Sequence, residues 1–273
     1  MEEKKFSSAE SLRFGFKTVF NNIVFFLSLE GLIALIAAAV GAAILGILYL
    51  FWSSEVAIIC KGANASCFEK YASLQAIGNF FKSFAHNNSE VDANITSFLK
   101  NSYVMIPGIL ISYFVINFLY RFIVLGLVRI TLDFYDHGTS NFKRLFSSFS
   151  LTLKAFAASI LYNAMIVIGT LLFIIPGIIA AIRFGFYQQV LVDKNVGIID
   201  SLKMSAQITK GSALNIFGVN IFFGLINIAA YFTFGLTYLI TLPALYLVQA
   251  YIYRKLIGSP ATINAHYTDN KDY

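Results

Sequence analysis

Charged residues are scarce in this 273-residue sequence. Asp, Glu, Lys and Arg together make up 12% of it, whereas 58% of the residues are hydrophobic and the mean hydropathy is +0.73. A soluble domain has about 25% charged residues and cannot cover this much apolar surface with so little polar surface. The composition therefore argues against a soluble globule and a disordered chain. It also argues against a nucleic-acid-binding protein, although the formal net charge is +6.

Histidines and the common catalytic motifs are also rare or missing. The three histidines are His86, His137 and His266, and no two of them have the spacing of metal ligands. The sequence has no glycine-rich phosphate loop, nucleophile elbow or zinc-binding helix motif. Asp133 and Asp136 lie beside His137 and could bind a metal ion, but a solvated turn is the favoured interpretation. We therefore predict no catalytic, cofactor or metal site, and a protein that is not an enzyme.

Four long apolar stretches contain about half of the residues, and their lengths predict the number of membrane spans. A helix needs roughly 20 residues to cross a hydrocarbon core about 30 Å thick. The first two stretches each fit one tilted span, whereas the last two are too long for one crossing and should each form two helices. Pro176-Gly177 predicts a turn in the third stretch, and Thr233-Phe234-Gly235 a weaker one in the fourth. The predicted spans are 23–50, 104–130, 155–175, 178–193, 213–233 and 237–254.

Positive charge favours six spans over four. With the N-terminus inside, six spans place 13 of the 20 Lys and Arg residues in short cytoplasmic segments, whereas four spans leave ten inside and seven outside. The positive-inside rule therefore selects six spans, with both termini in the cytoplasm. The first 20 residues lack the apolar core and cleavage site of a signal peptide.

An amphipathic segment precedes each predicted pair of spans. These segments lie at 7–22, 141–153 and 196–210. We expect each to form a helix in the inner membrane interface, with Arg13 and Lys17 of the first at the lipid headgroups. Whether the three units are true internal repeats, as in some transport proteins, stays open at this point.

The predicted fold class is therefore all-α. We expect a single polytopic helix bundle over 1–273, made of three transmembrane hairpins that each follow a cytoplasmic amphipathic helix. The region 52–102 forms the one long external loop and contains both cysteines, Cys60 and Cys67. Disulfides persist on that side of the membrane, and six intervening residues permit a bridge if the chain turns back. Two free thiols are the alternative.

Three patches of the sequence resemble known membrane families. The segment IIPGIIAAIRFGFYQQVLVDKNVGIIDSLKMSAQITKG at 174–211 resembles the signature of the YciC-type family of uncharacterised bacterial inner-membrane proteins. Residues 125–149 and 242–256 are similar to a loop and a C-terminal span in related families. Those families include domains of unknown function and the membrane domain attached to some glycerophosphodiester phosphodiesterases. The resemblance implies a multi-pass protein of the bacterial plasma membrane, and it implies no activity.

Three charged residues lie inside predicted spans, where charge is costly and often functional. Glu30 lies about eight residues into the first span, and Arg121 lies eight residues before Arg129, the expected end of the second. The matching depths predict an ion pair between Glu30 and Arg121. This pair would either hold the hairpin together or act as a coupling site that accepts a proton or counter-ion. Arg183 is expected near an external turn, where it can extend to headgroups or bind an anionic lipid.

Uncharged polar residues and small residues mark further helix faces. Asn220 and Asn227 share a face of the fifth span, where they either line a polar path or form hydrogen bonds to other helices. Small residues recur every four positions in the first span and predict a close helix contact, within the chain or with a second copy. These residues are Ala34, Ala38, Ala42 and Gly46.

Taken together, the sequence favours a non-enzymatic membrane protein that contacts lipid as a scaffold, accessory subunit or membrane-homeostasis factor. Its expected partners are membrane lipids and either a second copy or another membrane protein. The alternative is a transporter or channel for a small solute, ion or lipid, which the intramembrane charges and the hairpin pattern would suit. A water-accessible cavity reaching Glu30, Arg121 or Asn220 would favour transport, whereas a dry bundle would favour a scaffold.

Overall fold

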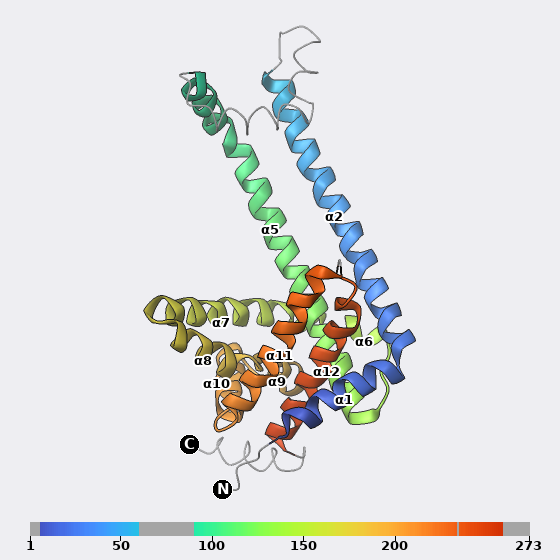
Figure 1. Cartoon of the computed structure of the whole chain (residues 1–273). Coiled ribbons are helices and arrows are strands. Elements are labelled where there is room, and N and C mark those ends of the chain that lie inside the picture. The colour runs from blue at the N-terminus through green and yellow to red at the C-terminus, as the bar shows by residue number, and fades with distance from the viewer. Residues whose placement is uncertain (1–5, 60–89, 234, 259–273) are drawn as a thin grey trace. The chain divides into compact units, whose positions relative to one another are not determined.

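The computed structural model describes residues 6–59, 90–233 and 235–258. Every regular element in these ranges is a helix, which confirms the all-α fold class (Figure 1). The chain divides into two compact units, one formed by Met1–Ile33 with Phe118–Tyr273 and the other by Ala34–Asn117. We call the former the first unit, and it contains all of the clusters described below.

Two long helices belong to both units, and the remaining helices belong to the first. The long helices are α2 (Ile23–Ile59) and α5 (Glu90–His137). The others are α1 (Ser8–Asn21), α6 (Lys143–Phe146), the 3-10 helix η1 (Phe149–Leu151), α7 (Thr152–Leu172), α8 (Ile174–Phe184), α9 (Tyr187–Lys194), α10 (Ile198–Ile208), α11 (Ala213–Phe232) and α12 (Tyr238–Ile257).

In the described part of the chain, four helical segments are long and apolar enough to cross a membrane, which supports a multi-pass membrane protein. A fifth is present if α10 and α11, which are bent by 100° from each other, count as one broken span. Helices α11 and α12 cover the predicted fifth and sixth spans, but α12 is not among these segments. The six-span arrangement therefore stays a prediction. The four segments are Ile23–Ile47, Leu110–His137, Lys143–Leu172 and Ile174–Lys194.

The predicted external loop is shorter than expected at both ends. Helix α2 continues to Ile59 and α5 begins at Glu90, so residues 52–59 and 90–102 are helical. Cys60 and Cys67 lie outside the described residues.

Helix α12 is buried at the centre of the first unit, and α1 packs along it. Val248 and Leu247 of α12 are fully buried, as is Val19 of α1. The two helices touch at Gly15, where a Cβ atom would lie 2.5 Å from Val248 Cγ2 and 2.9 Å from the carbonyl oxygen of Ala244. Only glycine permits this approach without displacing the backbone of α12.

The prediction of a helix within 7–22 is confirmed, but its apolar face contacts protein. Phe16 stacks on Phe223 of α11 with ring centroids 6.1 Å apart, and Phe14 packs against Tyr251 of α12 at 5.2 Å. Arg13 and Lys17 are exposed on the other side of the helix, as expected. An amphipathic pattern indicates which face of a helix is apolar, but it does not indicate whether that face contacts lipid or protein.

The predicted helix within 196–210 is also confirmed, and it packs against α7, α8 and α9. Ser205 of α10 donates a hydrogen bond to the carbonyl oxygen of Arg183 at 2.9 Å and accepts one from the backbone N–H of Phe186 at 3.0 Å. Thr209 donates to the same Arg183 carbonyl at 3.2 Å. This helix therefore docks on the bundle through a buried face of small polar side chains, and its position in the membrane interface stays a prediction.

The first turns of α1 and α10 share one detail that bears on the possible repeat. Ser11 and Ser201 are both fully buried, and each hydroxyl donates to the carbonyl oxygen three residues earlier at 2.7 Å. In both sequences an acidic residue precedes the serine and Leu-Arg or Leu-Lys follows it. The two segments thus have the same local structure, which supports their equivalence, while a threefold repeat stays a prediction.

The predicted single helix over 141–153 is wrong. The segment is divided into α6, η1 and the start of α7. Leu145 is fully buried against Gly126 of α5, where a Cβ atom would lie 2.5 Å from the Leu145 carbonyl oxygen. Directly after α6, the Ser147 hydroxyl donates to the carbonyl oxygen of Arg144 at 2.8 Å. Serine hydroxyls compete in this way for backbone groups and interrupt regular helices.

The turn predicted at Pro176-Gly177 lies three residues earlier. Phe173 is extended, with φ −162° and ψ 150°, and separates α7 from α8, so that Pro176 falls in the first turn of α8. Proline is tolerated there because the first-turn N–H groups have no intrahelical acceptor. Gly177 is required for packing, because a Cβ atom at this position would clash with Thr170 of α7.

The small-residue face of α2 is exposed in the second unit. An added Cβ at Gly46 would meet nothing within 4 Å. The described residues therefore supply no partner helix for this face. Its members are Ala34, Ala38, Ala42 and Gly46, all of them exposed.

Substituting Gly15 tests the contact between α1 and α12. We expect Gly15→Ala to lower the stability of the purified protein by about 1–3 kcal/mol, because overpacking outweighs the higher helix propensity of alanine. The measurement is thermal unfolding in detergent, followed by circular dichroism. Gly31→Ala in α2 is the control, since a Cβ there meets nothing within 4 Å. Equal melting temperatures for the two variants would contradict the packing described.

Candidate functional site

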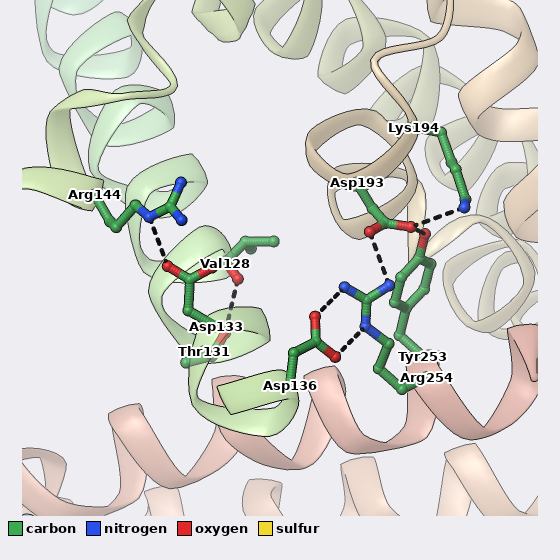
Figure 2. Close-up of polar contacts among 9 residues, drawn as sticks. All are labelled: Val128, Thr131, Asp133, Asp136, Arg144, Asp193, Lys194, Tyr253 and Arg254. Atoms are coloured by element: carbon green, nitrogen blue, oxygen red, sulfur yellow. Dashed lines mark hydrogen bonds and ion pairs between the residues drawn. The ribbon is translucent and has the colours of Figure 1, made fainter. Parts of the chain in front are cut away.

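Arg254 of α12 holds two carboxylates from two other helices. Its Nε and Nη2 atoms bind both carboxylate oxygens of Asp136, at 3.0 and 2.5 Å, and its Nη1 binds Asp193 at 2.8 Å (Figure 2). The Tyr253 hydroxyl donates to the second oxygen of Asp193 at 2.9 Å, and Lys194 Nζ lies 3.4 Å from the same oxygen. We call these five residues the Arg254 network.

The Arg254 network lies where three helices end. Asp136 is in the last turn of α5, Asp193 is in the last turn of α9, and Arg254 is in the last turn of α12. The side chains of Arg254 and Asp193 are each 13% exposed, and that of Asp136 is 30% exposed. Charge-assisted bidentate bonds in such a shielded place are strong, so the network fixes the ends of these helices against one another.

A second carboxylate–guanidinium pair lies nearby on α5. Asp133 forms an ion pair with Arg144 Nε at 2.9 Å, which joins α5 to α6 (Figure 2). It also accepts a hydrogen bond from the Ser140 hydroxyl at 3.3 Å. Asp133 and Asp136 are thus both bound to arginines. Within the described residues, no group of three or more His, Cys, Asp or Glu side chains could hold a metal ion.

The predicted ion pair between Glu30 and Arg121 is wrong. Neither carboxylate oxygen of Glu30 has a hydrogen-bond partner among the described residues, although both oxygens are inaccessible to solvent. Arg121 instead donates from Nη1 to the hydroxyl of Tyr187 at 3.2 Å.

The helix register explains this difference. Helix α5 ends at His137 and not near Arg129. Arg121 is therefore about two turns further from the end of the helix than predicted. Phe26 of α2 packs against Phe134 of α5 with ring centroids 5.0 Å apart. Because the chain leaves the first unit through α2 and returns through α5, this contact places Glu30 near Ile130. Arg121 lies nine residues further, or about 13 Å along the helix axis.

Arg121 lies within a cluster of tyrosines contributed by several helices. Its guanidinium carbon lies 5.4 Å from the ring centroid of Tyr120. Tyr187, at the start of α9, also accepts a hydrogen bond from Gln188 Nε2 at 3.1 Å, and its ring packs against that of Tyr162 of α7 at 5.3 Å. Tyr246 of α12 lies within electrostatic range of Arg121 and Tyr187. We call this group the Arg121 cluster.

The other polar residues predicted inside spans are not brought together. Arg183 has an exposed side chain, and its carbonyl oxygen contacts α10 and not an external turn. Asn220 is exposed and Asn227 is partly buried on α11. Gln189 of α9 is buried and donates to Gln249 of α12 at 3.1 Å, which is an interhelical hydrogen bond of the kind expected for such residues.

The Arg254 network was not among the predicted sites, although the sequence contains a signal for it. Asp136, Asp193 and Arg254 each lie at or near the end of a predicted span, and all three ends were expected on the cytoplasmic side. Opposite charges at the same membrane depth are candidates for pairing. Which of several nearby Lys and Arg residues each carboxylate binds depends on helix packing, and the sequence pattern does not contain that information.

Replacing Arg254 tests the importance of the network. We expect Arg254→Gln to destabilise the protein by about 3 kcal/mol, because it removes the guanidinium that two shielded carboxylates share and leaves Asp136 without an opposite charge. Thermal and denaturant unfolding in detergent measure this loss. Arg144→Gln is the control, since that side chain is 48% exposed and its pair should contribute less than about 1 kcal/mol. Asp193→Asn added to Arg254→Gln should restore part of the stability, and a purely additive loss would argue against the bridge.

The two clusters differ in what they can do chemically. The Arg254 network has its charges matched and its bonding groups occupied, as a structural connection requires. The Arg121 cluster combines an arginine with phenol and amide groups and includes no carboxylate, so it is rich in hydrogen-bond donors. No family model, curated protein or solved structure matches the chain.

Proposed function

We propose that the chain is a non-enzymatic, multi-pass protein of a bacterial plasma membrane that contacts anionic lipid headgroups at its cytoplasmic end. The contact surface is the basic rim, formed by Arg13, Lys17, Lys143 and Lys255. One observation carries the proposal: these four cations are exposed, and they lie on α12 and on two helices, α1 and α6, that contact α12 or α5.

The positions of the four cations support a common surface. Arg13 and Lys17 are on α1, which packs along α12. Lys255 follows Arg254, and its Nζ lies 5.5 Å from the ring centroid of Tyr251. Lys143 begins α6, next to the Arg144 that binds Asp133.

Apolar side chains beside these cations support contact with a membrane. Phe20 of α1 is 59% exposed and Phe146 of α6 is 52% exposed. A surface that combines exposed aromatic rings with Lys and Arg is typical of the membrane interface. Each exposed cation near an anionic surface contributes about 1 kcal/mol to the attraction.

The Arg254 network supports the proposed orientation. It joins the ends of α5, α9 and α12, which are the predicted ends of the second, fourth and sixth spans. Ends that lie on one side of the membrane imply an even number of crossings between them, as three hairpins require. Excess positive charge at this end agrees with a cytoplasmic location, and the resemblance to YciC-type proteins agrees with the plasma membrane.

Lipid selectivity tests the basic rim. We expect the protein, reconstituted in mixed phosphatidylglycerol and phosphatidylcholine and then extracted, to retain phosphatidylglycerol in excess over its bulk fraction, as measured by native mass spectrometry. The variant R13Q/K17Q/K143Q/K255Q should lose this excess. The charge-preserving variant R13K/K17R/K143R/K255R is the matched control and should retain it. Equal lipid ratios in all three proteins would contradict the proposal.

A transporter is the second candidate function, and one observation favours it. Both carboxylate oxygens of Glu30 are shielded from solvent in a membrane-span segment, without a hydrogen-bond partner among the described residues. Carboxylates in such positions serve as proton- or cation-binding groups in many transport proteins.

Flux measurements separate the two candidates. Under the favoured proposal, vesicles containing the protein should show no flux of protons, potassium or labelled phospholipid above protein-free vesicles, and Glu30→Gln should change nothing. Entrapped pH-sensitive dye, potassium release and a lipid-scrambling assay measure these three species. A flux that disappears in Glu30→Gln would establish transport in place of the scaffold.

A further inference from the structure

We infer that the Arg121 cluster is a binding site for a phosphate group, held by the guanidinium of Arg121 and the hydroxyl of Tyr187. The phosphate can belong to a phospholipid headgroup or be free in solution. This site is separate from the basic rim, so it does not depend on the function proposed above.

Arg121 carries a charge that is not matched. It is a cationic side chain in the apolar segment Leu110–His137. Among the described residues it forms no ion pair with a carboxylate: the ion pairs are those of Asp133, Asp136 and Asp193 with Arg144, Arg254 and Lys194, and Glu30 has no partner. The ring of Tyr120 attracts the guanidinium but does not neutralise it. A charge in a membrane span requires a counter-charge, and an anionic ligand supplies one.

The cluster also has an excess of hydrogen-bond donors. The oxygen of the Tyr187 hydroxyl accepts bonds from Arg121 and from Gln188, so its own hydrogen is left to donate. Arg121 has five N–H groups, and its one described hydrogen bond uses one of them. Tyr187 is 2% exposed, so its hydroxyl is positioned by packing and not by solvent. The N–H groups of Arg121 and the hydroxyl of Tyr187 are therefore hydrogen-bond donors without a matching acceptor, and such a group of donors suits an anion.

Helix α9 begins at the cluster. Tyr187 and Gln188 are the first two residues of this helix, and the side chain of its N-cap residue Phe186 forms no capping hydrogen bond. The positive end of the helix dipole therefore lies at the cluster and adds to the attraction for an anion. Arginine prefers phosphate and carboxylate groups because its planar N–H pairs match two oxygen atoms at once.

The position of the cluster makes a phospholipid a suitable source. Tyr187 is six residues from Asp193 and Tyr246 is eight residues from Arg254, which is about 9–12 Å along α9 and α12, whereas Arg121 is fifteen residues from Asp136, which is about 23 Å along α5. Arg121 is partly exposed and Tyr120 is 55% exposed, which leaves the site open on one side. Basic sites between membrane helices on the cytoplasmic side bind phospholipid headgroups in this manner.

The test measures ligand-induced thermal stabilisation of the purified protein in detergent. The probes are short-chain phosphatidylglycerol, short-chain phosphatidylcholine, inorganic phosphate and sodium chloride at matched ionic strength. We expect phosphatidylglycerol to raise the melting temperature of the wild type more than phosphatidylcholine or salt does. Arg121→Gln should weaken the apparent affinity at least tenfold, which corresponds to about 1.4 kcal/mol. Arg183→Gln is the matched control, because it removes an arginine with an exposed side chain from another predicted span, and it should respond like the wild type.

The remaining outcomes decide the source of the phosphate and the validity of the site. A response to inorganic phosphate that also requires Arg121 supports a site for free phosphate, whereas a response to phosphatidylglycerol alone supports a lipid site. If Arg121→Gln does not fold, Tyr187→Phe decides, because it keeps the charge and removes only the hydroxyl. A weaker response in that variant supports the site. A wild-type response in Arg121→Gln or Tyr187→Phe, or no response beyond salt in the wild type, would overturn it.

Discussion

The bond between Arg254 and two carboxylates is the interaction on which the arrangement of the first unit depends. An apolar chain has few groups that can fix one helix against another with direction, because apolar contacts are numerous and individually weak. Arg254 binds Asp136 on α5 and Asp193 on α9, and it belongs to the most deeply buried helix, α12. It therefore connects three helices that are distant in sequence, and every surface at that end is placed relative to it.

The amphipathic helices contribute to the same construction. Helix α1 contacts α12 through Gly15, and α10 contacts α8 and α9 through Ser205 and Thr209. Both use small side chains that allow close approach, as helices do when they pack in membranes. The basic residues left exposed on α1 then lie at the edge of a folded surface, which gives the proposed lipid contact a defined geometry.

The two charged residues that sequence analysis paired have different surroundings. Glu30 of α2 is level with Ile130 of α5, which is about 13 Å along α5 from Arg121, and neither residue forms an ion pair among the described residues. A charge that is shielded from water without an opposite charge lowers stability. The phosphate site proposed at Arg121 gives one of them a partner, and the flux measurement examines the other.

The sequence by itself determined the fold class, the apolar helices and the two amphipathic helices α1 and α10. These depend on composition, length and periodicity, which are local properties. It did not predict the extent of α5, the break at Ser147 or the start of α8 before Pro176, because helix ends depend on contacts with other helices. The partners of Arg121 and Arg254 were decided only by the tertiary structure. A shift of two turns in one helix changes which side chains meet, and packing alone sets that shift.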